Sequence, residues 1–304
     1  MIIRSRDNWF RMLLAWHGSV LPSILPQLGL MLAVSMVALL GHGQLFGERV
    51  PLDTAPFSLL GVSLAIFLAF RNNASYQRYL EARQLWGRVL VAARALVSQT
   101  QAYLPAARFD HRLCAHQVIV FTHLLRHHLR GSDARADIER LLGAETAERL
   151  LPLAYRPITI LSEIRAALQA ADAAQPAPGQ LLWMMDAQVN ALGEAVGGCE
   201  RIASTPVPYP YAVLLHRTIY LYCFLLPFGL VHAIGTATPL MAVFVAYTLF
   251  ALEAIAQEIG DPFGDAPNAL ALEAICRSIE RSVLEMIGEQ LPPELAAGKD
   301  FRVN

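Results

Sequence analysis

Residues Thr54–Leu96 read TAPFSLLGVSLAIFLAFRNNASYQRYLEARQLWGRVLVAARAL, and their pattern determines the architecture of the chain. From Thr54 to Phe70 this stretch carries no charge, a run about long enough to cross a bilayer as a helix. Arg71 then begins a polar sequence, yet no proline occurs between Pro56 and Pro105 to break the helix. We therefore predict one helix that leaves the membrane and continues into water, over roughly 70 Å in total.

Two stripes of side chains mark the membrane half of this helix. The large stripe consists of Val62, Ile66 and Phe70. The small stripe beside it consists of Gly61, Ala65 and Ala69. Small residues every four positions let another helix approach closely in lipid, so a ring of identical helices could form with the large stripe toward its axis. The alternative is that the large stripe faces lipid or packs in the core of a bundle.

The composition is that of a membrane protein. Of the 304 residues, 55% are hydrophobic and 16% are charged, against about 25% charged residues in soluble proteins. The formal net charge of −1 offers no basic field for nucleic acid. The four cysteines are far apart, which predicts free thiols that are buried or face a reducing compartment.

Four membrane helices are predicted, in two hairpins. The first helix is expected at about Leu25–Leu40, and the Thr54 helix returns after a connector. Two more are expected near Tyr211–Val231 and Pro239–Gln257, because Pro227, Gly229, Gly235 and Pro239 mark the bend between them. Arginines flank this pattern on one side, which predicts that both termini lie on the cytoplasmic side of the membrane.

The first twenty residues resemble an interfacial helix, because Arg4, Arg6 and Arg11 alternate with large apolar side chains. A cleaved signal peptide is the rival interpretation, but the apolar run that follows is too long and lacks a clear cleavage site. The predicted domains are residues 1–96, 97–208, 209–258 and 259–304. The second of these is a helical cytosolic domain, and the last is a cytosolic C-terminal segment with an amphipathic helix.

Histidines gather in the stretch DHRLCAHQVIVFTHLLRHHLR, where His123 and His127 stand one helical turn apart. Such a pair can bind a metal, but no cysteine or carboxylate lies at ligand spacing, so a solvated or interfacial face is the preferred interpretation. Glu200 and Arg201 in GGCER are expected to form a structural pair at a helix end. We expect no metal and no cofactor.

Four features together resemble the bestrophin family, in particular its bacterial homologues. They are the stretch Ala55–Gly87 with FRNNASYQR, the stretch Gly197–Tyr211 with STPVP, the hydrophobic pair that follows, and the turn DPFG at Asp261–Gly264. The resemblance runs from the N-terminus to about residue 290. It implies a homopentamer, each chain joined by four further copies of itself, around a pore normal to the membrane.

The resemblance also implies roles for individual residues. Val62, Ile66 and Phe70 fall on the family's narrow hydrophobic neck, and Gln180 falls near its cytosolic constriction. Animal members carry an acidic run after DPFG that helps bind calcium. Here Asp265 is followed by Ala, Pro and Asn, too few carboxylates for the six to eight oxygens of a calcium site, so we expect no calcium activation.

The function predicted on this basis is conduction of monovalent ions, gated by wetting of the neck. The sign of the ion stays open, with a weak preference for cations such as sodium over chloride. The alternatives are a secondary transporter, or a membrane-anchored sensor or scaffold. An enzyme is not expected, because no metalloprotease, P-loop or triad motif occurs.

Overall fold

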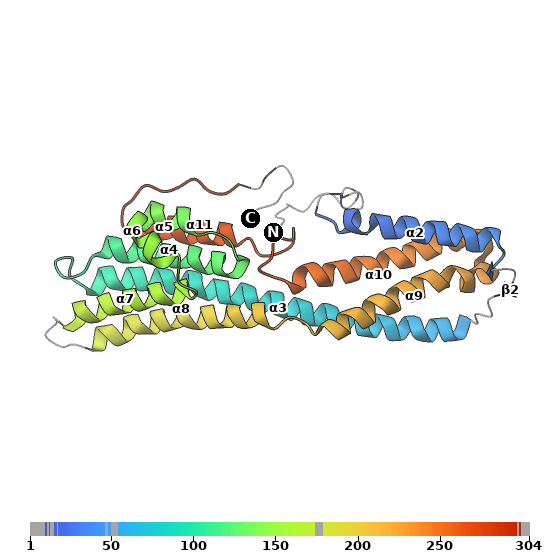
Figure 1. Cartoon of the computed structure of the whole chain (residues 1–304), viewed down its shortest axis with the longest axis horizontal. Helices are drawn as coiled ribbons and strands as arrows, with labels where there is room; N and C mark the ends of the chain where they lie inside the picture. Colours follow the sequence, from blue (N-terminus) through green and yellow to red (C-terminus); the bar gives the residue numbers. More distant parts are fainter. Residues whose placement is uncertain are drawn as a thin grey trace. The chain divides into compact units, whose positions relative to one another are not determined.

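The computed structural model describes residues 10, 12, 15–16, 18–45, 48–49, 54–173, 179–296 and 298. Helices make up most of these residues, which confirms the predicted all-α fold class (Figure 1). The three N-terminal arginines of the expected interfacial helix, and most of the loop AAQPAPGQ, lie outside the described residues.

The chain divides into two compact units, each assembled from separate segments. The apolar unit contains Pro206–Asp261 and the described residues up to Tyr79. The polar unit contains Leu80–Thr205 and the segment from Pro262 onward. The domain boundary expected after residue 96 therefore falls within the polar unit, and inside a helix.

That helix is α3, Thr54–Tyr103, a single helix of 50 residues. It confirms the prediction drawn from the stretch without proline. Because its first residues belong to the apolar unit and its later ones to the polar unit, α3 contributes to both.

In the apolar unit, the start of α3 joins three other long helices: α2 (Leu21–Leu40), α9 (Tyr209–Ile234) and α10 (Thr238–Gly260). Helix α10 packs on both α2 and α9. Apolar side chains from all four helices form a shared core. Its most enclosed members include Ile24, Met31, Leu64, Leu68, Ile219, Ala246 and Phe250.

Three helical stretches are apolar and long enough to cross a membrane: Leu21–Leu40, Phe57–Tyr103 and Tyr209–Gly260. The last of these comprises α9 and α10, of 26 and 23 residues, which are joined by the short 3₁₀ helix η1 (Gly235–Ala237). The four apolar helices expected from the sequence are thus all present.

Two of the four residues expected to mark the bend, Gly235 and Pro239, lie where α9 ends and α10 begins, and the other two do not. Pro227 and Gly229 lie inside α9, which continues to Ile234 and ends where Gly235 adopts a φ of +54°. Proline and glycine are tolerated in membrane helices because neighbouring groups and local adjustments satisfy the freed backbone.

The connector after α2 contains a small element that the sequence did not predict. β1 (Gln44–Leu45) pairs antiparallel with β2 (Glu48–Arg49), so Gln44 is opposite Arg49. Two residues per strand make this a tight turn rather than a sheet, and the fold class is unchanged.

The polar unit is a helical bundle around α4 (His111–Arg130). Helix α4 packs against α5 (Arg135–Leu142), α7 (Arg156–Ala173), α8 (Gln180–Ser204) and α11 (Leu272–Met286), and α6 (Ala144–Leu150) lies against α5. Its core contains Trp86, Phe121, Leu125, Ile138, Ile164, Val196 and Ile279, all essentially without solvent exposure.

The ends of α4 show why this segment is helical. The side chain of Asp110 accepts a hydrogen bond from Leu113 N at 2.9 Å and caps the first turn. Gly131, with a φ of +62°, closes the last turn in the left-handed conformation, and basic side chains fill that turn. Basic groups at this end of a helix interact favourably with the negative end of the helix dipole.

A second glycine sets the distance between α3 and α8. A Cβ atom at Gly198 would lie 2.7 Å from a methyl carbon of Leu85, so any larger residue would force that buried side chain to shift. The GG of the GGCER motif thus has a packing role inside the polar unit.

Candidate functional site

One face of α3 is buried in the apolar unit, and the opposite face is not. Leu64 and Leu68 are 2% and 1% exposed. On the large stripe, Val62 is 59% exposed, Ile66 51% and Phe70 61%. The large stripe is therefore no part of the core of its own chain, and only lipid, water or another copy can face it.

The small stripe has two different environments. At Gly61, a Cβ atom would lie 2.8 Å from the hydroxyl oxygen of Tyr222, so this glycine admits the tyrosine of α9. Ala65 and Ala69 are exposed. Any close helix contact made by these two alanines must come from outside the chain.

The first charges after the apolar runs form a buried group. Arg71 of α3 and Glu253 of α10 are each 8% exposed, and Arg71 Nη1 lies 3.4 Å from Glu253 Oε1. His216 Nδ1 of α9 lies 2.8 Å from the same oxygen. The sequence analysis missed this group, although Arg71 and Glu253 were visible as the residues that end two charge-free runs.

This group lies in the wall of an open cavity of about 590 Å³ within the apolar unit. Helices α3, α9 and α10 and the segment just before α9 supply the lining. Val207, Val213 and Ala256 form apolar parts of the wall, while Arg217 and Asp261 add two charged side chains.

Gln180, the expected cytosolic constriction, is the first residue of α8 and is exposed. Gly179 precedes it with a φ of +103°, and its N–H donates to Asp172 Oδ2 at 2.7 Å. The carboxylate of the buried Asp172 thus fixes where α8 begins and holds Gln180 at that end.

The turn DPFG lies at the end of α10, where Pro262 and Phe263 are buried. Arg130 of α4 donates to the carbonyl oxygens of Phe263 and Leu270 at 3.2 and 3.3 Å. The same guanidinium lies 3.7 Å from Asp265, so a fixed cation already occupies the neighbourhood of that carboxylate.

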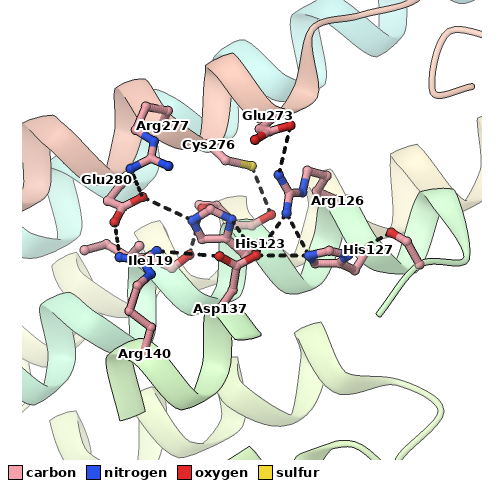
Figure 2. A network of polar contacts seen from close by, with 12 residues as sticks. Ile119, His123, Arg126, His127, Asp137, Arg140, Glu273, Cys276, Arg277 and Glu280 are labelled. Carbon is pink, nitrogen blue, oxygen red and sulfur yellow. Dashed lines mark hydrogen bonds and ion pairs between the residues drawn. The ribbon is translucent and has the colours of Figure 1, made fainter. Parts of the chain in front are cut away.

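A charged cluster fills the interface between α4, α5 and α11 (Figure 2). It consists of His123, Arg126, His127, Asp137, Arg140, Glu273, Arg277 and Glu280. At its centre His123 lies between two carboxylates: Nδ1 is 3.3 Å from Asp137 Oδ2, and Nε2 is 3.4 Å from Glu280 Oε2. Arg126 pairs with Asp137, and Arg140 pairs with Glu280.

Of the two alternatives expected for the histidines, a solvated or an interfacial face, the solvated one is wrong for His123, which is only 3% exposed. His127 shares the same carboxylate, with Nε2 3.0 Å from Asp137 Oδ2, and Arg126 donates to that oxygen at 2.9 Å. An arginine at this position repels a cation. Among the described residues, no group of three or more histidine, cysteine or acidic side chains could hold a metal.

The cluster perturbs its acids. Burial would raise the pKa of Glu280, but hydrogen bonds from His123 and Arg140 outweigh it and lower that pKa to about 2. For Asp137, burial is likewise outweighed by the hydrogen bond from His127 and by nearby positive charge, and its pKa falls well below the ordinary value. Both acids are therefore ionised at neutral pH.

The pairing predicted for Glu200 and Arg201 is different in the structure. Glu200 Oε1 lies 2.9 Å from His128 Nε2 of α4, whereas Arg201 pairs with Glu81 of α3. Neighbours along a helix point about 100° apart, so the two side chains join α8 to two different helices instead of to each other.

The cysteines are free and buried, as expected. Burial raises the pKa of Cys114, Cys199 and Cys276 to about 12, which keeps these thiols protonated and unreactive.

The comparison with known families decides the identity of the chain. Residues 1–285 match the family described as Bacterial/Fungal Bestrophin protein. The chain belongs to the bestrophin family. This confirms the resemblance drawn from the sequence, and with it the prediction that the chain is not an enzyme.

Relatives of known sequence match nearly the whole chain. A voltage-dependent anion channel-forming protein of Ralstonia nicotianae is 43% identical over 304 residues, 99% of each chain. The voltage-dependent anion channel-forming protein YneE of Escherichia coli is 37% identical over 313 residues, all of both chains. The bestrophin homologue of Klebsiella pneumoniae has a solved structure that is 40% identical, with a TM-score of 0.84 over 88% of this chain and 99% of that one.

Proposed function

We propose that this bestrophin chain assembles as a homopentameric ion channel of the bacterial inner membrane, with the large stripe as its pore neck. The observation that carries the proposal is the contrast along α3. Leu64 and Leu68 are enclosed by their own chain, while Val62, Ile66 and Phe70 stay more than half exposed. A ring of such helices would present three apolar layers to the axis.

The proposed neck discriminates only weakly between ions, because its three apolar layers offer no hydrogen bond to the water shell of an ion. Such constrictions conduct when they are wet and close when they dewet. Phe70 lies next to the buried Arg71–Glu253 pair, so the polar anchor of α3 immediately follows the last apolar layer. Gln180 at the start of α8 is the proposed second constriction, at the cytosolic exit.

The proposed topology has four passes, by α2, α3, α9 and α10, with both termini and the polar unit in the cytoplasm. Lengths and apolar composition of these helices support it, as does the gathering of arginines after Phe70. The Ala65 and Ala69 surface is the proposed contact between neighbouring subunits.

The proposed ions are monovalent, and the relatives' names favour anions. The sequence alone gave a weak preference for cations such as sodium, so the two signs are rival outcomes of one measurement. Purified protein in planar bilayers, with a tenfold sodium chloride gradient, should give a reversal potential of about ±58 mV for full selectivity of either sign. Native mass spectrometry of the same sample should give five copies. A monodisperse oligomer that passes no current would contradict the channel.

A secondary transporter is the second candidate, and one observation favours it. Arg71, His216 and Glu253 are ionisable and lie together among apolar helices, and groups of this kind can mark ion or proton pathways in transporters. A transporter would give no unitary current steps, but flux in vesicles that requires a coupled ion gradient.

A further inference from the structure

Two charged side chains that line the cavity of the apolar unit have no partner among the described residues. Arg217 of α9 and Asp261, just after α10, are exposed and line this cavity of about 590 Å³. In the part of the chain that the structure describes, neither side chain has an ion-pair or hydrogen-bond partner. Glu253, by contrast, is satisfied by Arg71 and His216. One unused cation and one unused anion therefore remain.

In the proposed topology, the cavity also lies at the level where the membrane ends. Arg71 and Glu253, in its wall, are the charges that close two apolar runs, one on α3 and one on α10. Tyr209 at the rim is 79% exposed, and tyrosine favours the headgroup region of a bilayer. Val207 and Val213 supply apolar wall next to these polar groups.

We propose that this cavity binds the headgroup of an amine-bearing zwitterionic phospholipid, phosphatidylethanolamine. Its phosphate diester accepts hydrogen bonds from the guanidinium of Arg217, whose planar fork suits phosphate oxygens. Its primary ammonium donates to the carboxylate of Asp261. Val207, Val213 and Ala256 lie against the glycerol and the first acyl carbons.

Charge and hydrogen bonding distinguish this lipid from its competitors. Phosphatidylglycerol has hydroxyls in place of the ammonium and leaves Asp261 without a counter-charge. Phosphatidylcholine has the charge but no N–H donor. The inference depends on the chain lying in a membrane and not on ion conduction, so a failure of either proposal can be recognised separately.

The test is lipid retention by the purified full-length oligomer, measured by native mass spectrometry after incubation with an equal mixture of the three lipids. Phosphatidylethanolamine should be retained about two- to fivefold over each competitor, the range expected for exposed ion pairs. Asp261→Asn should remove this preference, and Arg217→Gln, which loses the contact with the phosphate that all three lipids share, should lower the retention of all three. Arg217→Lys and Asp261→Glu should keep most of the wild-type retention and preference. Arg83→Gln, an exposed arginine of the polar unit, is the matched control and should change nothing.

Three results would overturn the proposal. They are equal retention of the three lipids by the wild type, an unchanged preference in Asp261→Asn, and a changed oligomer mass in Arg217→Gln, which would assign the cavity to a contact between copies. Competition with soluble glycerophosphoethanolamine distinguishes a site for the lipid from a site for the free headgroup. Failure to displace the lipid at millimolar concentration supports a lipid site, and full displacement would show that the free headgroup is the ligand and overturn the lipid assignment.

Discussion

Arg140 Nη1 of α5 donates to Glu280 Oε1 of α11 over 2.5 Å, and the Glu280 side chain has no exposed surface. This contact ties the last helix of the chain to a helix formed by residues far earlier in the sequence. Because Glu280 also lies beside His123, its negative charge balances two basic groups at once. Removing it would leave the half-exposed guanidinium of Arg140 and the buried ring of His123 without their shared acidic neighbour.

Glu280→Gln should therefore destabilise the polar unit at neutral pH by about 1–3 kcal/mol, the usual cost of removing one partner from a buried hydrogen-bonded group. The matched control is Glu148→Gln. Glu148 pairs with Arg135 on the surface, where such pairs contribute about 0–1 kcal/mol. Thermal unfolding of both variants checks the difference, and equal melting temperatures would contradict the structural role of Glu280.

The same carboxylate predicts a pH dependence. Folding lowers the pKa of Glu280 from 4.5 to about 2, so its contribution to stability is complete above about pH 4.5 and is lost as the pH falls toward 2. The melting temperature of the wild type should fall over this interval more steeply than that of Glu280→Gln. Parallel curves for the two proteins would show that Glu280 does not titrate with folding.

Ile66 and Leu68 offer a matched pair on one helix. Ile66 is 51% exposed and Leu68 is 1% exposed. Ile66→Ala should widen the proposed neck and raise single-channel conductance with a nearly unchanged melting temperature. Leu68→Ala removes buried carbon atoms and should cost about 2–5 kcal/mol. A destabilised Ile66→Ala with no gain of current, repeated in Val62→Ala and Phe70→Ala, would end the assignment of the pore.

Ala65→Leu tests the proposed contact between subunits. Ala65 is exposed within the chain, so the substitution should spare the fold of one subunit and weaken the oligomer by about 1–3 kcal/mol per site through overpacking. Gly61→Ala is the contrasting change, because its new methyl group meets Tyr222 of the same chain. Oligomer mass and melting temperature, measured together, separate the two effects. An intact oligomer in Ala65→Leu would count against the contact.

Channel activity should persist without calcium. Asp265 has an 83% exposed side chain beside Arg130, and a nearby guanidinium opposes the binding of a divalent cation. Bilayer currents recorded with a calcium chelator should equal those recorded with micromolar calcium. Currents that vanish with the chelator and return with calcium would show a site that these residues do not explain.

The proposed topology is tested by cysteine labelling from outside the cell. Thr236→Cys in the turn between α9 and α10 should react, and Ser132→Cys after α4 should not. Gly43 is a poor reporter, although it lies in the same outer region by the proposal: its φ is +74°, and a Cβ there would lie 2.8 Å from both His232 and Val231. External labelling of Ser132→Cys would reverse the assignment.

Helix α3 shows how far sequence reasoning reaches. The absence of proline between Pro56 and Pro105 predicted its length, because helix continuity depends on local backbone chemistry. The same local logic failed at Pro227, because the packed neighbours of a membrane helix can compensate for a missing backbone donor. Tertiary context decided the second case and was not visible in the sequence.

The histidine pair shows a different limit. His123 and His127 were predicted as a face because only their own spacing is visible in the sequence. Their acidic partners, Asp137 and Glu280, come from α5 and α11, and the contact with α11 spans more than half of the chain. Charge balance between helices that are far apart in sequence depends on packing, and no sequence motif predicts it.

The division of the polar unit into two sequence segments has a consequence for synthesis on the ribosome. His123 and Arg140 are made long before Glu280, and a chain grows at about 5–20 residues per second. For on the order of 10 s, α4 and α5 exist without the helix that neutralises their basic groups. The nascent polar unit must wait, partly open, until the apolar helices α9 and α10 have been made. Truncation of the chain before α11 would leave it permanently in that state.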